Sequence, residues 1–235
     1  NSAFATTVMG AILPTYFSAY IAAGRSLSLW GYTVAIGSLL AALISPILGA
    51  IADFRASKKK FMAIFVALGV ISTGLLFLVD TPEEWLLCCI LYILGTIGFA
   101  GSLVFYDSLL PHVAREDEID QVSSRGFAMG YIGGGILLLI NVLMIFLGPR
   151  LTPGMGEPQA TMFWMRLSLA SVAVWWAVFS IPLFRHVKEP VRMAEESEIG
   201  ESVVKVGFQR FIKALKDISK FQDLFWFMLT FLVYS

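Results

Sequence analysis

Few charged residues of this chain lie inside or beside its long apolar stretches. These residues are the candidates for ion pairs or for binding a ligand. Asp53 follows Gly49 by four positions and precedes Arg55 and Lys58. A small residue lets two helices approach closely, and a carboxylate at a helix end can meet a cation or the positive N-terminus of another helix. The spacing favours a conformational latch, a contact that forms in one state and breaks in another. The alternative is that Arg55 and the lysines at 58–60 only orient the chain in a membrane.

Two more charged residues lie within apolar stretches. Asp107 sits about one helical turn before the end of its stretch, so it should either join the charges of the latch or meet water. Arg166 lies near the start of another stretch, where its long side chain could reach out to water or face a central cavity and bind an anionic group. The remaining polar candidates for lining such a cavity are Asn1, Thr6, Tyr16 and Asn141.

Signals of enzyme chemistry are absent from the sequence. His112 and His186 stand alone, with no cluster at metal-ligand spacing, no nucleophile motif and no phosphate-binding loop. Cys88 and Cys89 are adjacent within an apolar stretch, as expected for small hydrophobic residues. We therefore expect no enzyme activity, no cofactor, no metal and no nucleic-acid partner.

The composition indicates which kind of structure must position these residues. Hydrophobic residues make up 57% of the 235 residues, charged residues only 14%, and the mean hydropathy is +0.78. Soluble domains carry about 25% charged residues. Six apolar stretches are long enough to cross a bilayer as helices, and a seventh begins near residue 223. They occupy residues 1–24, 28–52, 61–79, 85–110, 127–148 and 161–184.

The basic residues predict an orientation. Fourteen of the seventeen lysines and arginines lie in the loops after the second, fourth and sixth stretches. Cytoplasmic loops carry an excess of these residues, so these three loops should be cytoplasmic. The chain starts at Asn1 rather than Met and stops within the seventh stretch, so we expect a fragment of a longer protein.

Small residues recur four apart in the fifth stretch, at Gly126, Gly130 and Gly134. Such a stripe lets helices pack backbone to backbone, and it could also let them slide past one another. Pro14 and Pro46 fall inside the first two stretches, where they either kink the helix or free carbonyls for binding.

The loop at 185–222 has two parts. Its first part is acidic, whereas apolar residues in the second recur at helical spacing from 204 to 218 among lysines and arginines. This pattern predicts a basic amphipathic helix that lies either on anionic lipid or against the cytoplasmic ends of the spans.

The segment from Gly49 to Lys60 resembles the loop signature of the major facilitator superfamily, roughly Gly-x-Leu-Ala-Asp-Arg-x-Gly-Arg-Lys. Ser57 stands where that family usually has arginine, so a cation for Asp53 would come from Lys58 or Arg55. Together, segments 1–7, 105–111 and 120–135 resemble the vacuole-effluxer-like family, the autophagy-related branch of this superfamily. The resemblance implies about twelve helices in two bundles of six, and its eukaryotic members are associated with amino-acid export from the vacuole.

The sequence thus predicts an all-α integral membrane protein. Residues 1–184 form the six-helix N-terminal bundle, 185–222 a cytoplasmic linker, and 223–235 the start of the second bundle. We expect a secondary transporter of small polar solutes, such as an amino-acid effluxer, in a prokaryotic cytoplasmic membrane. Its partners would be a solute, protons or another coupling ion, membrane lipid and its own C-terminal half. The alternatives are a cation-coupled sugar symporter of the same superfamily and a non-transporting membrane scaffold or sensor.

Overall fold

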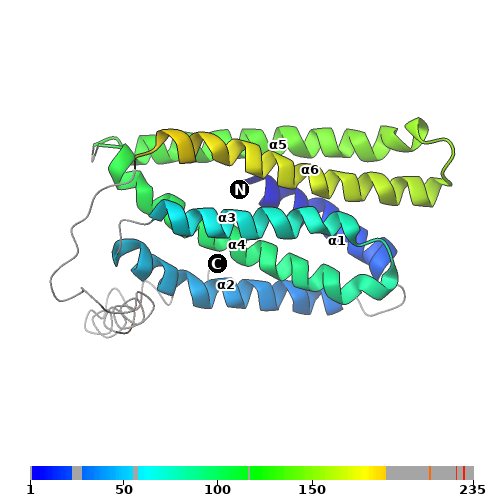
Figure 1. Cartoon of the computed structure of the whole chain (residues 1–235), viewed down its shortest axis with the longest axis horizontal. Helices are drawn as coiled ribbons and strands as arrows, with labels where there is room; N and C mark the ends of the chain where they lie inside the picture. The colour runs from blue at the N-terminus through cyan, green and yellow to red at the C-terminus, as the bar shows by residue number, and fades with distance from the viewer. Residues whose placement is uncertain are drawn as a thin grey trace.

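The computed structural model describes residues 2–22, 28–54, 58–115 and 117–188, except the side chains of Asp53 and Phe54, together with Ile212, Trp226 and Thr230. Six long helical spans run along the long axis of the bundle (Figure 1). All six are long and apolar enough to cross a membrane. The bounds are η1 (Phe4–Ile12), α1 (Leu13–Tyr16) and η2 (Phe17–Ile21) for the first span, then α2 (Ser28–Phe54), α3 (Lys58–Leu75) with the turn η3 (Leu76–Leu78), the turn η4 (Pro82–Glu84) with α4 (Trp85–Val113), α5 (Ile119–Leu151) and α6 (Glu157–His186).

The predicted fold class is confirmed, since six membrane-length helices are present and the described ranges contain no strand. The helix ends differ from the predicted stretches. α5, for example, begins eight residues before the predicted start at 127, because its polar first turns are helical although they are not apolar. The predicted linker and seventh stretch lie outside the described residues, apart from 185–188 and the three isolated positions, so the proposed domain division stays a prediction.

The two ends of the bundle differ in charge. The basic end carries the connections between α2 and α3 and between α4 and α5, together with the end of α6. The opposite end carries the connections from η2 to α2, from α3 to α4 and from α5 to α6. These two names are used below, and which end faces the cytoplasm stays a prediction.

The first span is wound differently from the others. It is a π-helix over Phe4–Ile12 and Phe17–Ile21, with a short α-helical turn between them that contains Pro14. Proline lacks a backbone N–H and crowds the turn before it, so α-helical bonding is interrupted in the preceding segment, which is the π-helix Phe4–Ile12. Pro46, by contrast, lies within the continuous helix α2.

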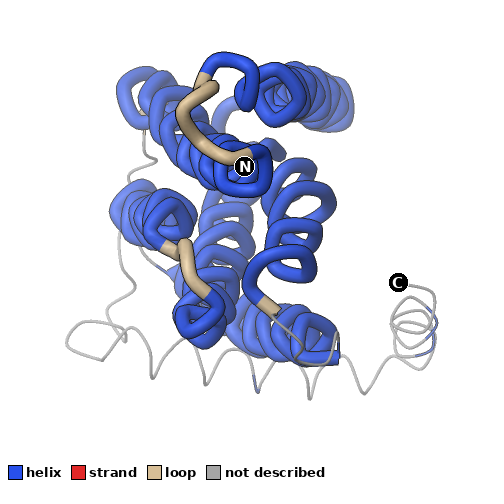
Figure 2. Tube along the Cα trace, turned by 90° about the vertical axis from the view of Figure 1, so that its right-hand side faces the viewer, coloured by secondary structure: helices blue, strands red, loops and turns tan. Residues whose placement is uncertain are grey.

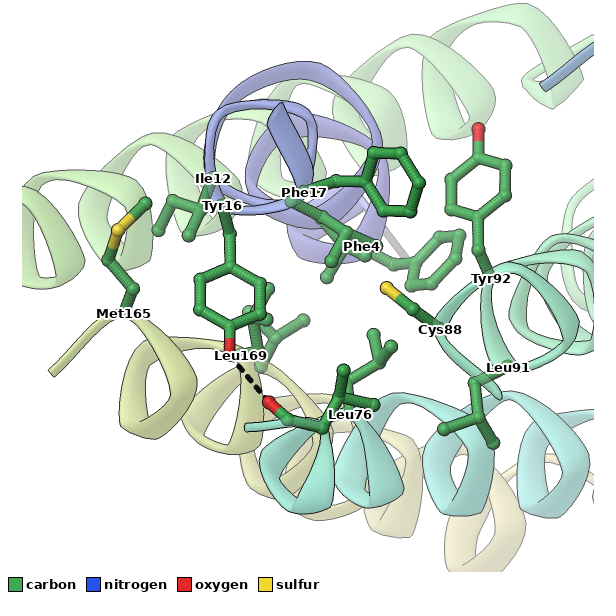
Figure 3. Packing of buried hydrophobic residues seen from close by; sticks show 14 of the residues in the cluster. Phe4, Ile12, Tyr16, Phe17, Leu76, Cys88, Leu91, Tyr92, Met165 and Leu169 are labelled. Carbon is green, nitrogen blue, oxygen red and sulfur yellow. Dashed lines mark hydrogen bonds between the residues drawn. The ribbon is translucent and has the colours of Figure 1, made fainter. Parts of the chain in front are cut away.

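The main hydrophobic core surrounds the first span. Phe4, Tyr16 and Phe17 are buried beneath residues of α4 and α6, including Tyr92 and Leu169 (Figure 3). The ring of Phe4 lies 5.6 Å from that of Phe99 and 5.5 Å from that of Trp176, measured between centroids. These contacts place the first span in the centre of the bundle.

The spans pack in a regular pattern. The first span packs against α5 and α6, whereas α4 packs against α2 and α3, and α3 also packs against α6. Figure 2 shows the helices nearly end on in this arrangement. α3 and α4 approach most closely at glycines, because a Cβ atom on Gly98 would lie 2.4 Å from the backbone nitrogen of Gly69. No larger residue fits at Gly98 without moving a helix.

Candidate functional site

A groove of about 510 Å³ opens between α3, α4, α5 and α6 in the half of the bundle nearer the basic end. Ser2 and Ala3, at the start of the first span, lie at its edge. One side of α4 contributes residues at steps of three and four, which are Leu103, Tyr106, Asp107 and Leu110, together with Ser102. The facing residues of α5 and α6 are mostly apolar and aromatic, with two serines: Ser123, Phe127, Trp175, Phe179, Ser180 and Phe184.

Among the residues that the structure describes, Asp107 is the one carboxylate in the lining of this groove. It is exposed and forms no ion pair with any residue in the described ranges. Lys58, which the sequence placed near it, instead donates from Nζ to the carbonyl of Ser108 at 3.0 Å and lies 3.3 Å from Nε2 of His112. Lys58 therefore holds the start of α3 against the last turns of α4, beside Asp107 rather than on its carboxylate.

The other members of the predicted latch are only partly described. Gly49 lies in α2, and a Cβ atom built on it would meet nothing within 4 Å. Asp53 belongs to the last turn of α2, but its side chain and the whole of Arg55 lie outside the described residues. The latch thus remains a hypothesis, and the described contacts of Lys58 are those to Ser108 and His112.

Of the residues predicted to line a cavity, the four that the structure describes are not among those that line the groove. Asn1 lies outside the described residues, and Thr6 donates to the carbonyl of Ser2, four residues back, at 3.0 Å. Tyr16 is fully buried, and its hydroxyl points toward the end of α3 (Figure 3), where it donates to the carbonyl of Val79 at 2.5 Å. These side chains serve contacts within and between spans.

Asn141 also lies within the bundle. It is fully buried in α5, and its Oδ1 accepts a hydrogen bond from Ser171 of α6 at 2.8 Å. Its Nδ2 has no partner among the described atoms. The amide therefore joins α5 to α6, and both N–H donors of its Nδ2 are without a partner among the described atoms.

Arg166 lies at the opposite end and faces neither the groove nor open water. Its Nε donates to the carbonyl of Phe77 at 2.6 Å, and its Nη1 lies 3.3 Å from Oδ2 of Asp80. The guanidinium also lies 4.9 Å from the centre of the Phe77 ring. Glu84 accepts from the backbone N–H groups of Asp80 and Thr81, at 2.7 and 3.1 Å, and so shapes the same turn. This outer clamp, formed by Arg166, Phe77 and Asp80, joins α6 to the turn between α3 and α4.

The glycine stripe of α5 faces two neighbours. A Cβ atom on Gly130 would lie 2.6 Å from Oγ of Ser2, and one on Gly134 would lie 3.1 Å from Oγ1 of Thr6. One on Gly126 would lie 3.3 Å from the hydroxyl of Tyr106 in α4. The stripe is thus a surface of close helix approach, mainly to the first span.

Sequence reasoning missed two contacts that shape the ends of the bundle. Asp80 was not singled out, although Thr81 to Glu84 form a capping box that marks an ordered turn beside it. Lys59 was counted only as part of a basic loop, whereas its Nζ donates to the carbonyls of Phe184 and Val187 at 2.7 and 2.8 Å. Cations suit the negative C-terminal end of a helix, so the basic loop after α2 also caps α6.

Comparison with known proteins places these features in a family. The sequence pattern of the family described as "Vacuole effluxer Atg22 like" matches residues 14–235. An uncharacterized MFS-type transporter of Bacillus subtilis, YxiO, is 36% identical over the whole of this chain and 54% of its own length. Autophagy-related protein 22 of Coccidioides immitis is 25% identical over 64% of this chain and 32% of its own length. This chain therefore spans about half of the first relative and about a third of the second. No solved structure matches it significantly.

Proposed function

We propose, starting from the fact that this chain belongs to the family of vacuole effluxers like Atg22, that the full-length protein is a secondary transporter of small polar solutes. It works by alternating access, in which this six-helix bundle rocks against a second bundle supplied by the C-terminal half. The observation that carries the proposal is the packing pattern of the six spans.

Much of the pattern is that of an inverted repeat, although the packing of α5 against α6 has no counterpart of similar extent between α2 and α3. If the first three spans are exchanged with the last three in order, the contacts of the first span with α5 and α6 become those of α4 with α2 and α3. The contact between α3 and α6 exchanges with itself. Because each triplet has an odd number of spans, corresponding helices run in opposite directions. Transporters that work by alternating access are commonly built from such repeats, whereas a scaffold has no need of one.

The groove supports a polar and partly cationic solute. A solute entering from the basic end would meet the carboxylate of Asp107, which has no ion pair among the described residues, and the side chains of Tyr106 and Ser123, which line the same groove. A carboxylate within a span marks a functional site by default, because placing a charged side chain in the membrane without a partner costs free energy. We infer amino acids as the solute class, since their ammonium group suits this carboxylate, and efflux as the direction, in keeping with the family description.

The latch completes the proposal. Asp53 lies in the last turn of α2 at the basic end, where Lys58 already ties α3 to α4. A contact from Asp53 to the second bundle would close this end in one state. A carboxylate facing a helix N-terminus contributes about 0.3–1 kcal/mol, and up to ~2 kcal/mol when partly buried. Asp53→Asn in the full-length protein should therefore slow transport while leaving membrane insertion intact. Wild-type transport by this variant would reduce the loop to its orienting role.

The deciding experiment uses the full-length protein in liposomes. We expect counterflow of labelled amino acids that unlabelled amino acids inhibit, with empty liposomes as the control. Dissipation of an imposed proton gradient then tests whether protons are coupled. Counterflow of sugars alone would favour a sugar symporter, and no counterflow of either class would favour the scaffold.

A further inference from the structure

We propose that the basic ends of α3 and α6 together bind the phosphate headgroup of an anionic phospholipid. α3 begins with Lys58, Lys59 and Lys60, and α6 ends with Arg185 and His186, followed by Lys188. The hydrogen bonds from Lys59 to the carbonyls of Phe184 and Val187 bring these two ends together. The site rests on this contact and does not depend on transport.

The cations at this place divide into two groups. Lys58 and Lys59 donate to carbonyls of α4 and α6, so their charges complement helix C-terminal ends. Lys60, Arg185 and Lys188 are exposed and form no ion pair with any residue of the described ranges. We call these last three the cationic triad. They lie at the ends of two helices that the contacts of Lys59 hold together, and positive charge gathered at these ends favours an anion.

The position of Lys60 adds to this preference. It lies in the first turn of α3, where the helix already carries partial positive charge on its free N–H groups. Three lysines in that turn are electrostatically unfavourable in the absence of anions. The C-terminal carbonyls of α4 and α6 offset Lys58 and Lys59, whereas the described residues supply no such partner for Lys60.

Apolar surface runs from the triad along both helices. Lys60 continues into an exposed stripe on α3, and Arg185 ends a similar stripe on α6, each with the four–three–four spacing of one helix face. α3 and α6 lie side by side along the bundle (Figure 1). A surface that is apolar along its length and cationic at one end complements a lipid with an anionic headgroup. The stripes are Lys60, Ile64, Ala67 and Ile71 on α3, and Val174, Val178, Ile181 and Arg185 on α6.

The lipid is distinguished from a free anion by these stripes. Inorganic phosphate would use the triad alone, whereas a phospholipid would also cover Ile64 and Ile181, which are 60% and 44% exposed. A third occupant is the acidic stretch with Glu195, Glu196, Glu198 and Glu201, which follows α6 in the sequence and lies outside the described residues. We argue for the lipid because it accounts for the triad and both stripes.

The test is native mass spectrometry of the full-length protein in detergent, offered equal amounts of phosphatidylglycerol and phosphatidylcholine with the same acyl chains. We expect the wild type to retain more phosphatidylglycerol, with a preference that falls as salt rises. A basic residue near an anionic membrane surface contributes about fivefold, so Lys60→Gln/Arg185→Gln should lower the preference by up to about thirtyfold.

The matched control is Arg115→Gln/Arg125→Gln, which removes the same charge at the same end of the bundle. It should keep the preference, because Arg115 is 82% exposed and pairs loosely with Asp117 at 3.9 Å. Lys60→Arg/Arg185→Lys should keep it as well. An equal loss in both glutamine variants would overturn the proposal, since the effect would then be one of net charge.

Three further results would overturn it without any variant. The first is that the wild type retains both lipids equally, and the second is that its preference does not change with salt. Either result would mean that the protein has no such site or that its own acidic stretch covers it. Displacement of phosphatidylglycerol by an equal concentration of inorganic phosphate would assign the triad to a free anion.

Discussion

Replacing Arg166 by methionine should destabilise the bundle far more than neutralising its partner Asp80. The outer clamp is asymmetric, because the Arg166 side chain is 14% exposed whereas that of Asp80 is 49% exposed. Arg166→Met removes three interactions at once: the hydrogen bond to the carbonyl of Phe77, the contact with the Phe77 ring and the ion pair. Asp80→Asn removes only the ion pair.

The expected magnitudes follow from the class of each interaction. A half-exposed ion pair contributes about 0.2–1 kcal/mol. A hydrogen bond to a charged group contributes about 1.5–3 kcal/mol, and a cation over an aromatic ring about 0.5–1 kcal/mol. Allowing for non-additivity, Arg166→Met should lower the free energy of unfolding by about 2–4 kcal/mol, and Asp80→Asn by at most about 1 kcal/mol.

The assay is equilibrium unfolding of the full-length protein in mixed micelles, followed by tryptophan fluorescence. Arg150→Met is the matched control, since Arg150 lies 5.8 Å from the ring of Phe146 and has no ion pair in the described part of the chain. Arg150→Met should lower the free energy of unfolding by less than Arg166→Met does. A loss in Asp80→Asn as large as that in Arg166→Met would refute the reasoning, because the ion pair would then dominate the clamp.

Three further outcomes are expected. Cysteines introduced at Ser57 and Thr152 should react with impermeant maleimide from opposite sides of the membrane, with position 57 cytoplasmic, and labelling from one side only would refute the predicted orientation. Lys59→Gln should lower the free energy of unfolding by about 1.5–3 kcal/mol, because the carbonyls of Phe184 and Val187 at the end of α6 lose a charged donor. Lys60→Gln, at an exposed neighbour, should lower it by less than about 0.5 kcal/mol. Gly98→Ala should lower the free energy of unfolding by about 1–3 kcal/mol, because it forces α3 and α4 apart. Gly74→Ala should leave that free energy unchanged or raise it, because its Cβ would lie 3.5 Å from that of Ala173. Equal effects of the two variants would contradict the close approach at Gly98.

Hydropathy was sufficient to find the spans because lipid leaves few alternatives to a continuous helix. Hydropathy could not place the helix ends, because it identifies the apolar segment that crosses the lipid, whereas a helix can continue beyond that segment. α5 continues through Ser123, Ser124 and Arg125 at the basic end for this reason. The outer clamp was equally hidden. Arg166 and Asp80 are 86 positions apart, and only the packing of α6 beside the end of α3 brings them together.

The polar residues of the spans differ in how much they say about tertiary structure. Hydroxyl groups mostly form hydrogen bonds with the backbone of their own helix. Thr73 donates to the carbonyl of Gly69 and Thr96 to that of Tyr92, each four residues back. Such residues need no partner elsewhere, so a threonine such as Thr6 was weak evidence for a cavity.

Carboxylate, guanidinium and amide groups behave differently, because their own helix rarely satisfies all their hydrogen-bonding groups. Arg166 therefore reaches Phe77 and Asp80, and Asn141 accepts from Ser171 on the next helix. Asp107 has the same need and no ion pair in the described part of the chain, and its side chain lies on the groove. A charged group that the bundle leaves without a countercharge has to be satisfied by something the bundle meets, whether water, a solute or the second bundle. For this reason Asp107 is the residue from which a search for the solute site should begin.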